Sequence, residues 1–182
     1  MIRKSLACGG VVLTVLLAGC GPGHDPRDAK AFRAPDKFEA CALFPFEEAQ
    51  AIAGTSVASI SSTMEDAVGR DTKICSYNAG SVEVPQIMGL EVRPAQSVGE
   101  AERRQEGSRP FLGTLSKGQV VDVPGVGDAA FWAGGSVGQL HVRKGTVSLV
   151  VTIQAGKDPM GAAKQVAERA FTRMQQPKPA TP

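Results

Sequence analysis

Two neighbouring segments in which apolar and polar residues alternate restrict the fold most strongly. Residues 140–143 alternate in this way, and so do residues 147–154, which follow a turn at Lys144-Gly145. Successive side chains of a strand point to opposite faces of the sheet, so the pattern predicts a β-hairpin with one apolar face. His141 and Arg143 fall on the other face, which we expect to be solvated. The apolar face then needs other elements to cover it.

A later segment has the periodicity of a helix that could provide this cover. Asp158 is suited to cap its start, and Pro159 is suited to its first position. The apolar residues that follow recur with the spacing of one buried helical stripe, namely Ala163, Val166, Ala167, Ala170, Phe171 and Met174. The sequence therefore predicts a helix over residues 159–174 that lies along the sheet.

Weaker patterns complete the expected architecture. Pro45 and Gly54 are suited to the start and stop of a short helix. Ser97 and Glu100 form a capping box for a mostly polar helix that should end at Gly107 and lie on the surface. Strands are expected near residues 57–62, 72–79, 86–93 and 129–132. Together these elements predict an α+β domain, an antiparallel sheet with helices packed on one face.

The N-terminus has the features of a secretory signal peptide. Arg3 and Lys4 precede an uncharged, largely apolar run over residues 6–18. A helix needs about 20 apolar residues to span a bilayer, so this run is short for a transmembrane anchor. Cleavage and export are therefore favoured over a membrane-spanning helix.

The end of this run resembles a lipobox, the processing motif of bacterial lipoproteins, in Leu17-Ala18-Gly19-Cys20. The resemblance implies cleavage before Cys20 and attachment of lipid to its sulfur. Two or more acyl chains hold a protein stably at a membrane. Gly21 would imply the periplasmic side of the outer membrane in a Gram-negative host. In a Gram-positive host the protein would lie on the outer face of the plasma membrane.

Composition divides the chain into four parts. Residues 1–19 are the expected signal peptide, and residues 20–37, without apolar periodicity, are predicted to be a lipidated flexible tether. Residues 38–175 form a single α+β domain, and the Pro-rich residues 176–182 a disordered tail. Without Arg3 and Lys4, basic and acidic residues are equal in number. With no basic patch, nucleic acid is not an expected partner.

Two cysteines, Cys41 and Cys75, remain in the expected domain. Two thiols in an exported protein normally form a disulfide, and closing a loop of about 35 residues would contribute roughly 3–4 kcal/mol. The alternative, a metal-binding or catalytic thiol, needs a partner. The chain has two histidines: His24 lies in the expected tether and His141 in an expected strand.

These cysteines also lie in motifs that resemble those of a known group. The motifs are Cys41-Ala42-Leu43-Phe44, Cys75-Ser76-Tyr77 and the segment Val-Pro-Gly-Val-Gly-Asp-Ala-Ala-Phe-Trp at residues 123–132. Over about residues 40–174 the chain is similar to small bacterial lipoproteins of unknown function. The resemblance implies a Cys41–Cys75 disulfide and a location in the cell envelope. It implies no activity.

No catalytic pattern stands out. A serine nucleophile requires a histidine base, and His141, the only histidine of the expected domain, is predicted to be an exposed strand residue. The glycines near residues 125–138 match neither phosphate-binding fingerprint. We therefore predict no catalytic residues, no metal ligands and no cofactor.

The candidate binding residues are Trp132, the single tryptophan, and His141. Trp132 could pack in the core or could anchor a ligand or a partner. The expected function is that of a membrane-anchored, non-enzymatic module that binds an envelope protein, a lipid or the cell wall. The alternative is a small-ligand-binding lipoprotein or an envelope hydrolase whose site assembles from distant residues.

Overall fold

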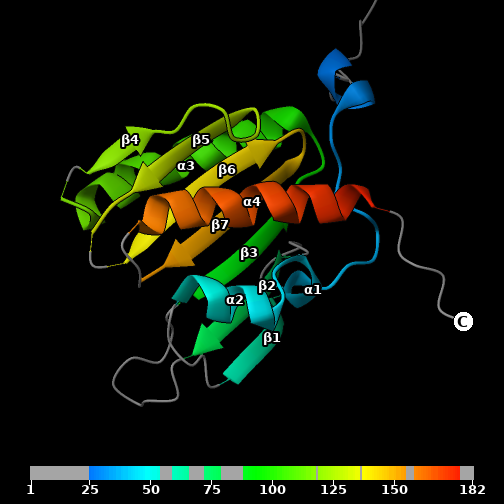
Figure 1. Cartoon of the computed structure of the whole chain (residues 1–182). Helices are drawn as coiled ribbons and strands as arrows, with labels where there is room; N and C mark the ends of the chain where they lie inside the picture. The colour runs from blue at the N-terminus through cyan, green and yellow to red at the C-terminus, as the bar shows by residue number, and fades with distance from the viewer. Residues whose placement is uncertain are drawn as a thin grey trace, which may run out of the picture.

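The computed structural model describes residues 25–53, 59–65, 72–78, 88–117, 119–135, 137–154 and 158–176. Within these residues the centre of the molecule is a seven-stranded sheet with the order β1-β2-β3-β7-β6-β5-β4 (Figure 1). All neighbouring strands are antiparallel. The strands are β1 (Ser59–Glu65), β2 (Thr72–Asn78), β3 (Met88–Pro94), β4 (Val120–Asp122), β5 (Ala129–Ala133), β6 (Gly138–Lys144) and β7 (Val147–Ile153).

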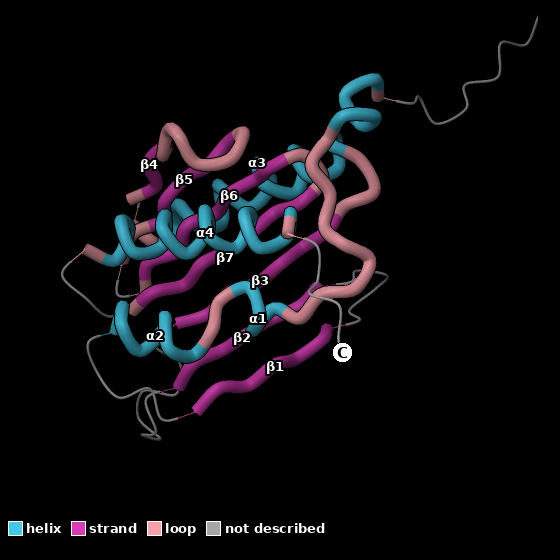
Figure 2. The backbone as a smooth tube through the Cα atoms, turned by 45° about the vertical axis from the view of Figure 1, so that its right-hand side comes forward, coloured by secondary structure: helices cyan, strands magenta, loops and turns pink. Residues whose placement is uncertain are grey.

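Three helices cover one face of this sheet, which confirms the predicted α+β class. They are α1 (Ala40–Leu43), α2 (Phe46–Ala53) and α4 (Pro159–Gln175) (Figure 2). Helix α4 begins where the sequence predicts, because an Asp158 carboxylate oxygen accepts a hydrogen bond from the Gly161 N–H at 2.9 Å. Its predicted stripe is buried against β6 and β7.

The main core lies between these helices and the sheet. Adjacent strands contribute apolar side chains from alternate positions, as the hairpin pattern predicts, and these are almost fully buried. The group includes Leu90, Val92, Leu140, Val142, Leu149 and Val151. The apolar face of the predicted hairpin thus forms part of the sheet side of this core.

Helix α3 (Val98–Leu115) differs from its predicted form in length and position. It continues through Gly107 and Pro110, and it lies on the opposite face of the sheet from α4 (Figures 1 and 2). A proline inside a helix costs about 3 kcal/mol. Leu112 offsets part of this cost by packing with Phe131 and Ala133 in a second apolar cluster. Tertiary packing, which the local sequence does not reveal, extends the helix.

Because α3 covers this face, the expectation of a solvated face for the hairpin is wrong at its centre. His141, Ser148 and Val150 are all buried there. The Gln105 side-chain amide donates hydrogen bonds to the carbonyl oxygens of Ala129 and His141, and so holds α3 to two strands.

The N-terminal segment also differs from the sequence-based expectation. Residues 25–37, assigned by composition to the flexible tether, pack on the domain and include a short 3-10 helix, η1 (Pro26–Lys30). A carboxylate oxygen of Asp28 accepts a hydrogen bond from the Val98 N–H at 2.7 Å, and Phe32 packs edge-on against Phe171 at 5.3 Å. The Phe32 carbonyl accepts a hydrogen bond from the Thr146 N–H. These single, non-periodic contacts leave no pattern in the sequence.

Gly145 makes this docking possible. Its φ of 56° is in the left-handed region that favours glycine, and a Cβ placed there would lie 2.3 Å from the Phe32 carbonyl oxygen. The hairpin turn therefore requires glycine both for its backbone conformation and for the close approach of the N-terminal segment.

The predicted signal peptide, Cys20, residues 21–24 and most of the predicted tail lie outside the described residues. Among the helices that are described, none is long and apolar enough to cross a membrane.

Candidate functional site

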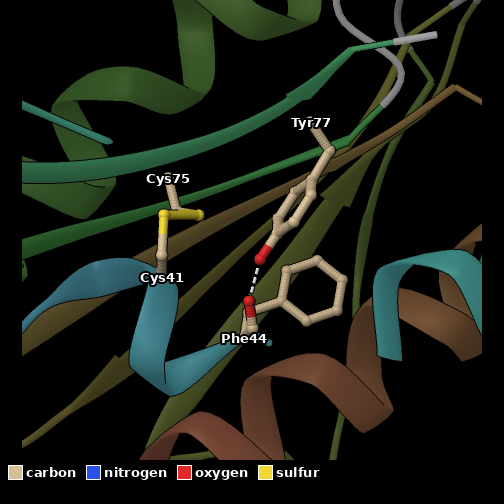
Figure 3. Close-up of a disulfide and its surroundings, with 4 residues drawn as sticks. All are labelled: Cys41, Phe44, Cys75 and Tyr77. Atoms are coloured by element: carbon tan, nitrogen blue, oxygen red, sulfur yellow. Dashed lines mark hydrogen bonds between the residues drawn. A yellow bond between two sulfur atoms is a disulfide. The ribbon is translucent and has the colours of Figure 1, made fainter. Parts of the chain in front are cut away.

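The predicted disulfide is confirmed and joins α1 to the sheet. Cys41 on α1 bonds to Cys75 on β2, two residues before Tyr77 (Figure 3). The Tyr77 hydroxyl donates a hydrogen bond to the Phe44 carbonyl oxygen, and the Phe44 and Tyr77 rings meet edge to face at 5.0 Å. Burial raises the pKa of Tyr77 above its usual value. Cys75 and both rings are fully buried and Cys41 is partly buried, so this cluster stabilises the fold.

His141 is buried, contrary to the prediction of an exposed strand residue. Its side chain is 7% exposed, beneath α3, and its ring stacks on Phe131 with the centroids 4.7 Å apart. Burial, with a smaller contribution from the positive charge of Arg93, lowers the pKa of His141 to about 4. The imidazole is therefore neutral near pH 7.

The surroundings of His141 leave no room for a substrate. The hollow beside it has a volume of about 10 Å³, about that of a single water molecule, and is also lined by Arg93 and Ser148. The Ser148 hydroxyl is buried and has no hydrogen-bond partner among the described residues. His141 and Ser148 are thus neighbours without the hydrogen bond that a nucleophile and its base require.

The low pKa of His141 predicts a specific loss of stability in acid. In the unfolded chain the imidazole binds a proton below a pKa of about 6.5, whereas the folded protein binds it only below about 4. Stability should therefore fall as the pH drops through this window, by up to about 3 kcal/mol. We expect a His141→Phe variant to lack this component, which chemical denaturation at several pH values would measure. Parallel pH profiles for the two proteins would contradict the prediction.

Trp132 and His141 do not share a site, although both are candidates from the sequence. Trp132 pairs with Leu140 across β5 and β6, whereas Phe131 pairs with His141, so the two candidates lie on opposite faces of the sheet. Trp132 is half-buried and packs against the main core. A Cβ at Gly138 would lie 2.1 Å from its indole ring. The indole therefore covers the backbone of β6.

Among the residues whose burial is described, the most exposed large apolar side chains are at the C-terminal end of α3. Phe111 is 66% exposed and Leu115, one turn later, is 64% exposed. Val137, 37% exposed, lies with Leu115 around a hollow of about 200 Å³. The other lining residues are Leu112, Ser116, Ala133, Gly134, Gly135 and Gln139. We call Phe111, Leu115 and Val137 the α3 patch.

The sequence patterns do not predict this patch, because they end the helix at Gly107 and leave residues 111 and 115 outside any predicted helix. The spacing of Phe111 and Leu115 is that of two neighbours on a helix surface, and this was the one available signal.

A second surface feature lies at the other end of α3. A depression of about 570 Å³ is formed by η1, the start of α3 and the turn between β6 and β7. We call it the η1 groove. Its charged side chains are Arg27, Lys30, Glu102, Asp128, Arg143 and Lys144. Glu102 pairs with Arg27 at 2.8 Å and with Arg143 at 3.4 Å, and Asp128 pairs with Arg143 at 3.4 Å.

A further depression of about 410 Å³ lies beside the turn at residues 123–128. Its lining includes the turn residues 123–128 and the charged residues Glu106, Arg109 and Asp122, and Arg109 pairs with both of these carboxylates. Across the described ranges, no three His, Cys, Asp or Glu side chains are grouped so that they could hold a metal ion.

Comparisons with known proteins do not assign a function to this chain. No family model and no curated protein sequence matches this chain. Among solved structures, the crystal structure of a GTP binding regulator from Thermotoga maritima is similar over 79% of this chain and 95% of that chain. The two are 12% identical in sequence, with a TM-score of 0.39. At this score the activity of that protein has no bearing on this one.

Proposed function

We propose that this protein is an exported lipoprotein, anchored through lipid on Cys20, that acts as a non-enzymatic module and binds an envelope protein through the α3 patch. The anchor rests on the signal peptide and lipobox of the sequence. Export is also consistent with the Cys41–Cys75 disulfide, because disulfides persist in oxidising compartments.

The observation that carries the binding role is the α3 patch. Two large apolar side chains, Phe111 and Leu115, project from one side of α3. Most other large apolar side chains of the described residues are buried. An exposed apolar cluster beside a hollow is typical of a protein-binding surface. The 200 Å³ hollow is smaller than pockets for small ligands, which span about 300–1,000 Å³. Its size and mostly apolar lining suit one anchoring side chain of a protein partner.

Among the residues that the structure describes, the candidate residues do not form the arrangement that the enzymatic alternative requires. A hydrolase would need a cleft that brings a base and a nucleophile together. His141 is buried on one face of the sheet, and Trp132 lies on the other. The geometry therefore favours partner binding.

Photo-crosslinking in intact cells tests this function. A photoreactive residue at position 115 should give one discrete adduct with an exported protein, identified by mass spectrometry. The same residue at position 168, exposed on α4 and distant from the patch, should give none. A Phe111→Glu change should reduce the adduct at least about tenfold, because it puts a charge into the apolar contact.

The same crosslinking experiment also tests the lipid anchor. The Cys20→Ser variant should move to the soluble fraction and lose most of the adduct, because the proposed lipid anchor holds the patch at a high local concentration near its partner. Absence of an adduct from positions 111, 115 and 137, or an equal adduct from position 168, would overturn the proposed function.

A further inference from the structure

The docked N-terminal segment determines which part of the domain lies near the lipid anchor. Asp25 is the first described residue and follows Cys20 by five positions. Five extended residues span at most about 18 Å. A domain of this size is about 40 Å across, as its expected radius of gyration of about 15 Å indicates. Cys20 therefore reaches only the end of the domain that carries η1.

The lining of the η1 groove at this end has four basic side chains against two acidic ones, and Arg27 also pairs with Asp25 just outside the lining. Its two acidic residues, Glu102 and Asp128, are both engaged by arginines. No ion pair joins Lys30 or Lys144 to a carboxylate within the described part of the chain. The Lys144 ammonium lies 5.0 Å from the Phe32 ring centroid and 5.5 Å from that of Phe171. Two lysines are thus left to interact with an external anion.

We infer that the η1 groove faces the anchoring membrane and contacts its anionic phospholipid headgroups through Lys30 and Lys144. The inference rests on the proposed lipid anchor at Cys20. A basic side chain at an anionic bilayer strengthens binding by about fivefold, so two lysines do not anchor the domain alone. With the lipid in place, they orient it.

This orientation places the α3 patch away from the membrane. Val98 and Glu102 line the η1 groove, whereas Leu115 belongs to the patch at the far end of the same helix. With a rise of 1.5 Å per residue, Val98 and Leu115 are about 25 Å apart along α3. Helix α3 therefore separates a membrane-facing end from a partner-binding end.

Lysine footprinting on the lipidated full-length mature protein tests the inference. The protein is reconstituted into neutral phosphatidylcholine vesicles, or into vesicles with about 30 mol % phosphatidylglycerol. An amine-reactive reagent should modify Lys30 and Lys144 about fivefold more slowly in the anionic vesicles. Lys117, just beyond the far end of α3, should react equally in both and provides the internal control. Inorganic phosphate with neutral vesicles should not protect Lys30 or Lys144, because the proposed ligand is the membrane surface.

A charge-reversal pair gives a second readout. Unlipidated Cys20→Ser protein carrying Lys30→Glu and Lys144→Glu should lose its weak binding to anionic vesicles by an order of magnitude or more. Lys117→Glu with Lys164→Glu, an equal change in net charge, should have a smaller effect, and thermal unfolding should confirm that both fold. Equal losses, or wild-type lysines that react at one rate in both vesicles, would overturn the orientation. Failure of the native protein to float with any vesicle would instead overturn the anchor.

Discussion

Replacing Ala167 with aspartate is expected to lower the free energy of unfolding by about 3–5 kcal/mol. Ala167 is fully buried in the stripe of α4, within the core that α4 forms with β6 and β7. A carboxylate there would lose its hydration without gaining a partner. Chemical denaturation monitored by circular dichroism would measure the change.

The matched control is Gln165→Asp, which makes the same aspartate at an exposed position of the same helix. It should change stability by no more than about 1 kcal/mol, the range of helix propensity and surface effects. If Ala167→Asp and Gln165→Asp unfold at the same denaturant concentration, the α4 stripe does not face a core.

Removing the disulfide is expected to have the second large effect. The Cys41→Ala, Cys75→Ala double variant should be less stable by about 2–5 kcal/mol. The bond closes a loop with a sequence separation of 34, and its loss frees the unfolded chain from that constraint. It also releases α1 from β2, where Phe44 and Tyr77 pack together (Figure 3).

Reductant separates this effect from the change in side chains. It should destabilise the wild type by about as much as the double substitution does, and should leave the double variant unchanged. Protein purified from the envelope and unfolded without reductant should show no reactive thiol. Titration of two thiols would contradict the assignment of an oxidised pair in the exported protein.

The η1 groove and the α3 patch give the domain two ends with different surface chemistry. One is charged and close to the predicted lipid anchor, and the other is apolar. Between them, the Gln105 amide and Leu112 fasten α3 to the sheet. A partner bound at Leu115 would therefore be held about 25 Å along α3 from the end that carries the η1 groove.

Elements with local, periodic signals are predictable from the amino-acid sequence. In the hairpin of β6 and β7, apolar residues recur with the period of a strand, and in α4 they recur with the period of a helix. Each pattern therefore indicates both the type of the element and its buried face. The disulfide is predictable because the expected domain holds only two cysteines and the N-terminus has the features predicted for an export signal.

The length of α3, the docking of residues 25–37 and the burial of His141 are not predictable in this way. Each depends on contacts between residues distant in the chain: Leu112 with Phe131, Asp28 with Val98, and the cover that α3 lays over His141. Local propensity ended α3 at Gly107, because glycine and proline disfavour helix wherever packing does not compensate. The candidate surfaces lie at the two ends of that helix, and for this reason the sequence alone did not reveal them.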